Sequence, residues 1–227
     1  MKRKSLAAFT LIEMLVVISI IVVLAAFAGP ALFNALAKGQ MTGSINNARQ
    51  LYLAAQQMAL DGATNSDSTR TWPGDDATIT TLPIYCSRLV TNGYLQTGDL
   101  QKILSAPGAV CSASSTTAGT PPVTTVTLTG TSALKVYPVK ETDSTNTIFA
   151  VTSNYTYNSA LTSTAAPYGD KGFVVQRKGG DAALLKTNNA TATSGQGSSF
   201  QSVVGKKPLD SDGNPTVGDP TGTLKFP

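Results

Sequence analysis

One ionisable side chain lies inside a long apolar stretch near the start of this 227-residue sequence. Between Ser5 and Ala37, Glu13 is the only side chain that is charged at neutral pH. Inserting a carboxylate at the centre of a bilayer helix costs about 2.5–3.5 kcal/mol, so such a residue is normally functional and paired or neutralised. Glu13 is therefore the first candidate functional residue, and it needs a partner.

The chain contains no histidine, which removes several catalytic and metal-binding arrangements. A Ser-His-Asp or Cys-His nucleophile cannot be built, nor can a histidine-ligated metal site. Nucleophile-elbow, P-loop and dinucleotide-binding motifs are also missing. Asp75 and Asp76 could serve carboxylate catalysis, but adjacent acids in a polar loop are typically solvated. We expect a protein that is not an enzyme, with an anchored hydrolase as the alternative.

The residues on either side of Glu13 predict a membrane span. Lys2, Arg3 and Lys4 precede a run of nineteen residues, 9–27, in which Glu13 is the only charge. About twenty such residues cross a bilayer as a helix. Positive charge before the span keeps that end in the cytoplasm and places the remainder of the chain outside it.

The motif Ala8-Phe9-Thr10-Leu11-Ile12-Glu13, together with the basic segment before it, resembles the class III signal of type IV pilins and pseudopilins. The resemblance implies that residues 1–8 are a leader, which prepilin peptidase removes by cleaving between Ala8 and Phe9. It also implies that the new Phe9 amine is methylated and that Phe9 and Glu13 act in assembly. Ala8 is a departure, because the family usually has glycine before the cleavage site.

Other interpretations of the N-terminal segment start from the same residues. Ala26-Phe27-Ala28 resembles the cleavage site of an ordinary secretory signal, but Glu13 would then lie in the apolar region, where a charge is unfavourable. A plain single-span anchor, or an anchored binding module that keeps its leader, is a further alternative.

A second helical pattern follows the span. Apolar residues recur at intervals of three or four, which predicts an amphipathic helix that packs one face against other structure. Asp61-Gly62 is a typical helix end. We therefore predict an N-terminal helix over 9–60 and a globular head over 61–227. The apolar positions are Met41, Ile45, Ala48, Tyr52, Ala55 and Ala59.

The head contains short runs of β-branched and aromatic residues separated by turn residues, which predict an antiparallel sheet. Residues 84–104 read as a short helix or compact loop, and residues 112–122 as an exposed run of low complexity. A sheet laid on the second half of the helix gives an α+β fold. The predicted strands are 123–128, 135–139, 148–157, 173–177 and, more weakly, 200–204.

Cys86 and Cys111 are the two cysteines of the chain. In a chain that leaves the cytoplasm they favour a disulfide, and two free buried thiols are the alternative. Two cysteines without histidine cannot complete a standard zinc site.

A stretch near the C-terminus offers oxygen ligands of the kind that calcium prefers, although its spacing is not that of an EF-hand. Major pseudopilins of type II secretion carry a C-terminal calcium loop, which this stretch resembles in placement. The same residue types also stabilise turns, so the sequence leaves calcium as the one cofactor to consider. The candidate ligands are Asp210, Asp212, Asn214 and Asp219.

The charge of the chain does not indicate a nucleic-acid partner. The formal net charge is +4, from 17 basic and 13 acidic residues, and loss of the leader removes three of the basic ones. Charged residues make up 13% of the chain, about half the usual share, which suits an extracellular surface protein.

Taken together, the resemblance implies a structural subunit of a type IV pilus-like filament. Such a subunit resides in the inner membrane and then enters a periplasmic or cell-surface helical filament of identical copies. Its partners would be prepilin peptidase, an inner-membrane assembly platform and the membrane. The alternative is a type II secretion pseudopilin, whose short fibre acts as a piston in protein export.

Overall fold

The structure, a computed structural model, describes residues 10–157, 159–191 and 222–226. The chain divides into two compact units, Met1–Gly39 and Gln40–Pro227. One long helix, α1 (Leu11–Asn65), contributes residues to both units. Its helical conformation continues through Gly29 and Pro30.

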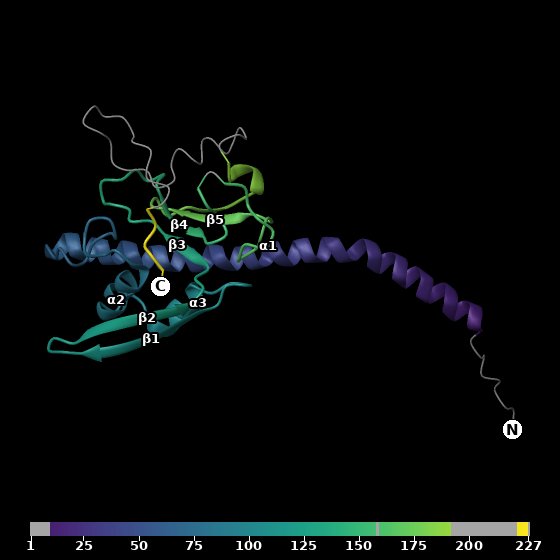
Figure 1. Ribbon diagram of the computed structural model, residues 1–227, viewed down its shortest axis with the longest axis horizontal. Helices are drawn as coiled ribbons and strands as arrows, with labels where there is room; N and C mark the ends of the chain where they lie inside the picture. The colour runs from purple at the N-terminus through teal and green to yellow at the C-terminus, as the bar shows by residue number, and fades with distance from the viewer. Residues whose placement is uncertain (1–9, 158, 192–221, 227) are drawn as a thin grey trace, which may run out of the picture. The chain divides into compact units, whose positions relative to one another are not determined.

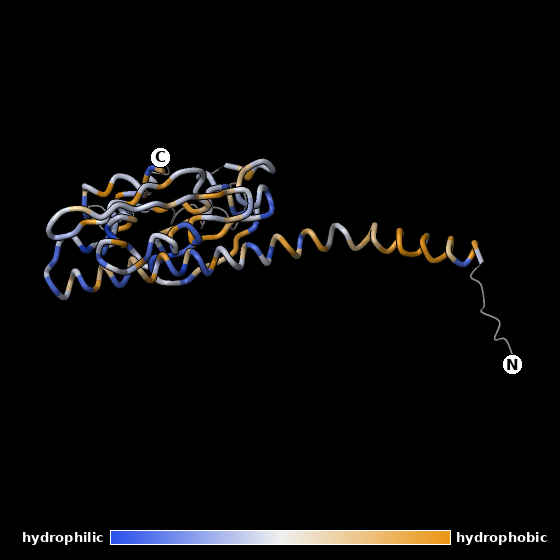
Figure 2. Tube along the Cα trace, turned by 90° about the horizontal axis from the view of Figure 1, so that it is seen from below, coloured by the Kyte–Doolittle hydropathy of each residue, from blue (hydrophilic) through white to orange (hydrophobic). Residues whose placement is uncertain are grey.

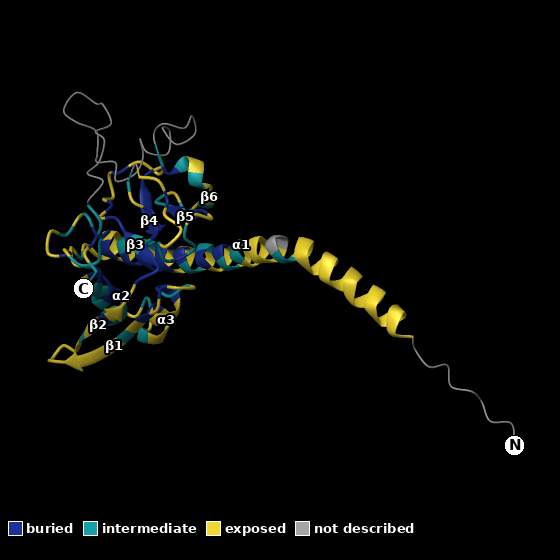
Figure 3. Cartoon of the chain, turned by 45° about the vertical axis from the view of Figure 1, so that its right-hand side comes forward, coloured by how far each residue is buried: buried dark blue, intermediate teal, exposed yellow. Residues whose placement is uncertain are grey.

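In the first unit, α1 is apolar and exposed on every side. All residues from Thr10 to Ala28 are exposed, as the yellow colour of this part of the helix in Figure 3 shows. Figure 2 shows the same turns as an almost continuous hydrophobic stretch. A water-soluble helix normally restricts its apolar residues to one stripe, so this half of α1 has the surface of a helix that lies in lipid or among other helices.

The second unit is an α+β head, as the sequence predicts. Two short helices and a two-stranded antiparallel hairpin follow α1, and a four-stranded antiparallel sheet of order β3-β4-β5-β6 completes the head (Figure 1). The elements are α2 (Leu82–Thr91), α3 (Thr97–Ile103), β1 (Cys111–Ala118), β2 (Val123–Gly130), β3 (Leu134–Val136), β4 (Ile148–Thr152), β5 (Phe173–Arg177), β6 (Ala182–Leu185) and a 3-10 turn (Thr187–Asn189).

The core of the head forms between the second half of α1 and the sheets. Tyr52 of α1, Trp72 of the following loop and Phe149 of β4 meet with ring centroids 5.7–6.1 Å apart. Such tilted and edge-to-face pairs add to the stabilisation that burial alone provides. The sequence pattern identified the correct face of α1 but omitted two of its fully buried residues, Leu51 and Met58.

The predicted helix end at residue 60 is wrong, because α1 continues to Asn65. Gly62 serves close packing instead of ending the helix. A Cβ at this position would lie 1.8 Å from the carbonyl oxygen of Arg70, so only glycine lets the returning loop lie against the helix. The helix ends where Ser66 adopts a left-handed conformation with φ of 54°.

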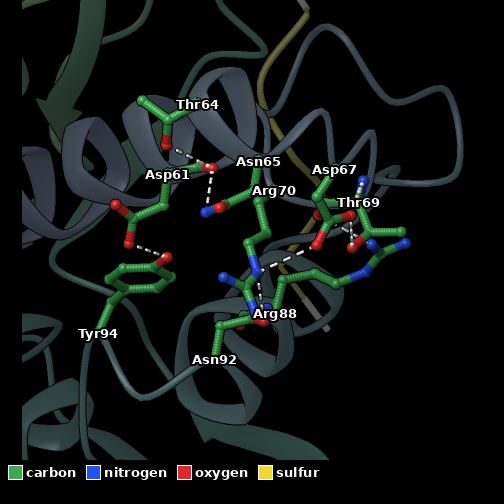
Figure 4. A network of polar contacts seen from close by, with 9 residues as sticks. All are labelled: Asp61, Thr64, Asn65, Asp67, Thr69, Arg70, Arg88, Asn92 and Tyr94. Carbon is green, nitrogen blue, oxygen red and sulfur yellow. Dashed lines mark hydrogen bonds and ion pairs between the residues drawn. The ribbon is translucent and has the colours of Figure 1, made fainter.

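Polar contacts attach the end of α1 to α2 and the loops beside it (Figure 4). The Tyr94 hydroxyl donates to the Asp61 carboxylate at 2.6 Å, and the Arg88 guanidinium donates to the Thr69 carbonyl oxygen at 3.0 Å. Arg70 donates to Asn92 and forms an ion pair with Asp67. All of these contacts except the Arg70–Asp67 pair join segments distant in sequence, so they fix the position of the first loop of the head.

The strand predictions are partly confirmed. Residues 173–177 match β5, residues 123–128 lie within β2, and β3 and β4 begin within one residue of the predicted starts but are shorter. Residues 112 and 114–122 are exposed, as predicted. No strand is predicted there from the sequence, however, and residues 112–118 belong to β1; β6 was also missed. The described strands form two sheets, not the single antiparallel sheet that the sequence predicts. The weak strand at 200–204 lies outside the described residues.

Leu51 and Leu53 of α1 provide a test of this core. Leu51 is 0% exposed and Leu53 is 50% exposed. Leu51→Ala should lower the free energy of unfolding by about 2–5 kcal/mol through lost burial and a residual cavity. Leu53→Ala should change it by less than about 1 kcal/mol. Denaturant unfolding in detergent micelles, followed by the fluorescence of the single tryptophan Trp72, measures both. Equal losses would contradict the assigned face.

Candidate functional site

Glu13, the charged residue of the apolar stretch, lies in the first turn of α1 and binds Thr10. The backbone N–H and the hydroxyl of Thr10 each donate to the same Glu13 carboxylate oxygen, both at 2.8 Å. The Glu13 N–H donates in return to the Thr10 hydroxyl oxygen at 3.3 Å. Thr10 precedes the helix and Glu13 is its third residue, so the pair forms a reciprocal capping box.

The capping box gives Glu13 a partner within its own helix. The first N–H groups of a helix have no acceptor within it, and a carboxylate there also interacts favourably with the positive end of the helix dipole. The sequence carries this signal as Thr10-x-x-Glu13 before an apolar run, a spacing that the sequence interpretation did not use. The carboxylate of an isolated chain is therefore hydrogen-bonded rather than unpaired.

Apolar side chains cover every direction around the helix beyond this cap. Leu11, Ile18 and Val22 are 83%, 58% and 66% exposed. Removing apolar surface from water is favourable by about 25 cal/mol per Å², so a helix with this surface is stable only in an apolar environment. By length and composition, α1 qualifies as a membrane-spanning helix, and it is the one such helix among the described residues.

A family model confirms what this segment is. The prokaryotic N-terminal methylation motif matches residues 3–29. The chain carries the class III prepilin signal of type IV pilins and pseudopilins. This signal implies processing by prepilin peptidase, assembly at the membrane and a structural rather than enzymatic role. Comparisons with curated proteins and with solved structures give no match.

The resemblance to prepilin signals predicts a cleavage site between Ala8 and Phe9, and both residues lie outside the described part of the chain. Of the predicted assembly residues, the structure places Glu13 alone. Cleavage between Ala8 and Phe9 and methylation of Phe9 therefore stay predictions.

Cys86 of α2 and Cys111 of β1 both lie in the core of the head as free, fully buried thiols. Burial raises the pKa of both thiols. The Cys111 side chain raises the pKa of Cys86 further, so the two thiols interact electrostatically. Disulfide exchange requires a thiolate, and burial disfavours the thiolate form of both side chains. The disulfide stays a prediction.

Asp75 and Asp76, the acidic pair considered for carboxylate catalysis, make contacts that stabilise the fold. Asp76 forms an ion pair with Arg88 at 3.0 Å, and hydrogen bonds from Thr78 lower the pKa of Asp76. Asp75 accepts a hydrogen bond from the Glu141 backbone N–H. Both carboxylates thus hold loops together.

The four possible calcium ligands fall outside the described residues, and calcium there stays a prediction. They are Asp210, Asp212, Asn214 and Asp219. The short segment that follows them is anchored: the N–H of Leu224, a core residue, donates to the Val136 carbonyl oxygen at 2.8 Å. Among described residues, no group of three or more acidic or cysteine side chains could hold a metal.

Processing can be tested directly on protein extracted from membranes. Intact-mass and N-terminal peptide analysis should find a chain that begins at an N-methylated Phe9, because the basic leader directly precedes the motif. A chain that begins at Met1 would contradict processing. A chain that begins at Gly29 would show that an ordinary secretory peptidase removes the apolar stretch.

The cysteine pair can be tested by peptide mapping without reductant. A Cys86–Cys111 disulfide would close a loop of about 25 residues and stabilise the head by roughly 3–4 kcal/mol if it is unstrained. We expect the linked peptide from cells with an active periplasmic oxidase, and two alkylated thiols from cells without it. Free thiols in both preparations would contradict the disulfide.

Proposed function

We propose that this chain is a structural subunit of a type IV pilus-like filament, made of copies drawn from the inner membrane after leader cleavage and N-methylation. The observation that carries the proposal is the first half of α1, a helix exposed and apolar all round, with one carboxylate in its first turn. The head supplies the outer surface of such a filament, and the helix supplies its core.

The chemistry of the helix start suggests how copies meet. Cleavage before Phe9 creates an amine four residues before Glu13 in the sequence, so the mature helix carries a cation and a carboxylate close together. Glu13 is already held by Thr10 through two hydrogen bonds to one oxygen. Its other oxygen can accept the Phe9 amine of a neighbouring copy, and a charge-assisted pair in an apolar medium is strong and directional.

Pairing between copies would set their stagger along the filament. Each incoming subunit would slide until its Phe9 amine meets the Glu13 carboxylate of a subunit already assembled. Side chains such as Leu11, Leu15 and Ile18 would then leave lipid for contact with other helices. Lipid tails are as apolar as leucine, so packing alone selects no register; the charged pair does.

Removing the carboxylate tests this mechanism. Glu13→Ala eliminates the charged partner and the capping acceptor, so processed monomer should accumulate in the membrane and surface filaments should fall at least about tenfold. Glu13→Gln keeps an acceptor for Thr10 but loses the charge, and it should fail equally. Thr10→Ala, which spares the carboxylate, is the matched control and should still assemble. Filaments are counted by electron microscopy in cells lacking other pilins.

The controls separate assembly from folding. The fluorescence and denaturant unfolding of the head should be unchanged in all three variants, because Thr10 and Glu13 belong to the unit Met1–Gly39. Wild-type filament amounts from Glu13→Ala cells would refute the mechanism.

Pseudopilins of type II secretion share the same signal, so a second measurement separates the two roles. Deleting the chain in its native host should abolish surface filaments while leaving protein export intact. Loss of export with unchanged surface filaments would assign the chain to the secretion piston.

A further inference from the structure

The hairpin of the head has an outer strand with an open edge. β1 is the outer strand, and β2 lies next to α2 (Figures 1 and 3). A strand at a sheet edge presents backbone N–H and C=O groups that can pair with another strand. The two edges of this hairpin differ in whether their backbone groups have hydrogen-bond partners.

The edge of β2 is closed by hydroxyl groups of α2. The Thr91 hydroxyl accepts from the Thr124 N–H at 2.9 Å and donates to the Thr124 carbonyl oxygen at 3.0 Å. The Ser87 hydroxyl accepts from the Val126 N–H at 2.8 Å. These side chains replace a neighbouring strand, so β2 has no free pairing edge over these residues.

The register of the hairpin shows which groups of β1 face outwards. In an antiparallel pair, alternate residues direct both backbone groups away from the partner. Thr124 and Val126 point outwards on β2 and lie opposite Thr117 and Ser115 of β1, so those β1 residues also point outwards, as does Ala113. The Ser105 hydroxyl closes this edge at Cys111.

The outward backbone groups of Ala113, Ser115 and Thr117 have no partner among the described residues. Ser115 and Thr117 are exposed, and Ala113 is half-buried. The contact that Ser115 makes with α3, from the Thr97 hydroxyl to its own hydroxyl, uses the side chain and leaves its backbone free. Edge strands are usually protected by charges, proline or a bulge, and β1 has no charged residue or proline.

We propose that this β1 edge pairs with the same edge of a second copy of the chain. Two β1 strands that meet antiparallel about a two-fold axis at Ser115 place Ala113 opposite Thr117 and Ser115 opposite itself. Every residue in these pairs is an outward one, so about six N–H···O=C bonds form. The register is self-complementary, as a two-fold contact requires.

Charge favours the second copy over other partners. None of the residues 111–130 is charged, so two hairpins approach without repulsion and without an opposite charge to attract a different protein. Small hydroxyl side chains at Ser114 and Thr116 leave room for two strands to meet.

The contact joins filaments to one another, a consequence that rests on the proposed function. Subunits within one helical filament meet through different surfaces, whereas a two-fold contact uses the same surface twice. The β1 edges therefore link heads of neighbouring filaments. One such edge contact is small, and repetition along two filaments multiplies its strength.

Register-specific cross-linking of the full chain in detergent micelles tests the pairing. The proposed axis places Ser114 of one copy opposite Thr116 of the other in a non-hydrogen-bonded pair, where Cα atoms lie about 4.5 Å apart and a disulfide fits. A mixture of Ser114→Cys and Thr116→Cys chains should cross-link under mild oxidation at least about tenfold more than either chain alone. The buried Cys86 and Cys111 should not take part.

The controls decide the outcome. Thr127 is an exposed residue of β2. In the proposed pair of copies, three strand spacings separate it from Thr127 of the second copy, so Thr127→Cys chains should not cross-link. A mixture that cross-links no better than Thr127→Cys, or no better than either chain alone, would overturn the proposal. Because micelles contain no filaments, this result stands whether or not the chain forms them.

In filaments, a matched pair of charge variants tests the consequence. Thr116→Lys places a charge on the edge strand, and Thr127→Lys places the same charge on β2. The first should reduce lateral bundles seen by electron microscopy at least about tenfold, and the second should leave them. Equal bundling in both variants would overturn the linking role, while a specific cross-link in micelles would keep the pairing itself.

Discussion

The apolar surface that the first half of α1 leaves exposed is the constraint on which the rest of the structure depends. Residues 10–28 of α1 are exposed without exception, and almost all of their side chains are apolar. Lipid can cover this surface and so can other helices, and the free-energy difference between the two is small because both are apolar. In the filament that we propose, transfer from the bilayer would therefore need little apolar driving force. Polar groups would decide when and in what register it happens.

The second half of α1 differs from the first, because it carries an apolar stripe that the head buries completely. Leu51, Ala55 and Met58 are fully buried, while Leu53 and Leu60 on the same helix are at least half exposed. The helix thus changes from uniformly apolar to amphipathic along its length. One continuous element can lie in a membrane at one end and organise a soluble core at the other.

Sequence patterns predicted the parts of this molecule in which local chemistry dominates. The prepilin signal, the apolar span and the amphipathic stripe all follow from residue type and spacing. The failures occurred where contacts beyond the local residue pattern decide. β1 is built of serine, threonine and alanine, which resemble loop residues, and it becomes a strand because β2 pairs with it while α2 closes the far edge of β2. In the sequence, Gly62 resembles a helix end. Its role in the structure depends on the Arg70 carbonyl, which lies eight residues further along the chain and leaves room only for glycine at position 62.

The capping box bears on the assembly role that we propose for Glu13. A lone carboxylate in lipid would be a strong driving force toward any cation, and membrane-bound monomers would pair indiscriminately. Glu13 is instead already hydrogen-bonded to Thr10 at the start of its helix. In the assembly that we propose, an amine from a neighbouring copy would replace one hydrogen-bonded state of the carboxylate by another, and the gain would be smaller than the cost of an unpaired charge. Such a modest gain would keep association reversible while a subunit is still in the bilayer. Misaligned copies could then separate, and the apolar packing of many helices would make the aligned arrangement permanent.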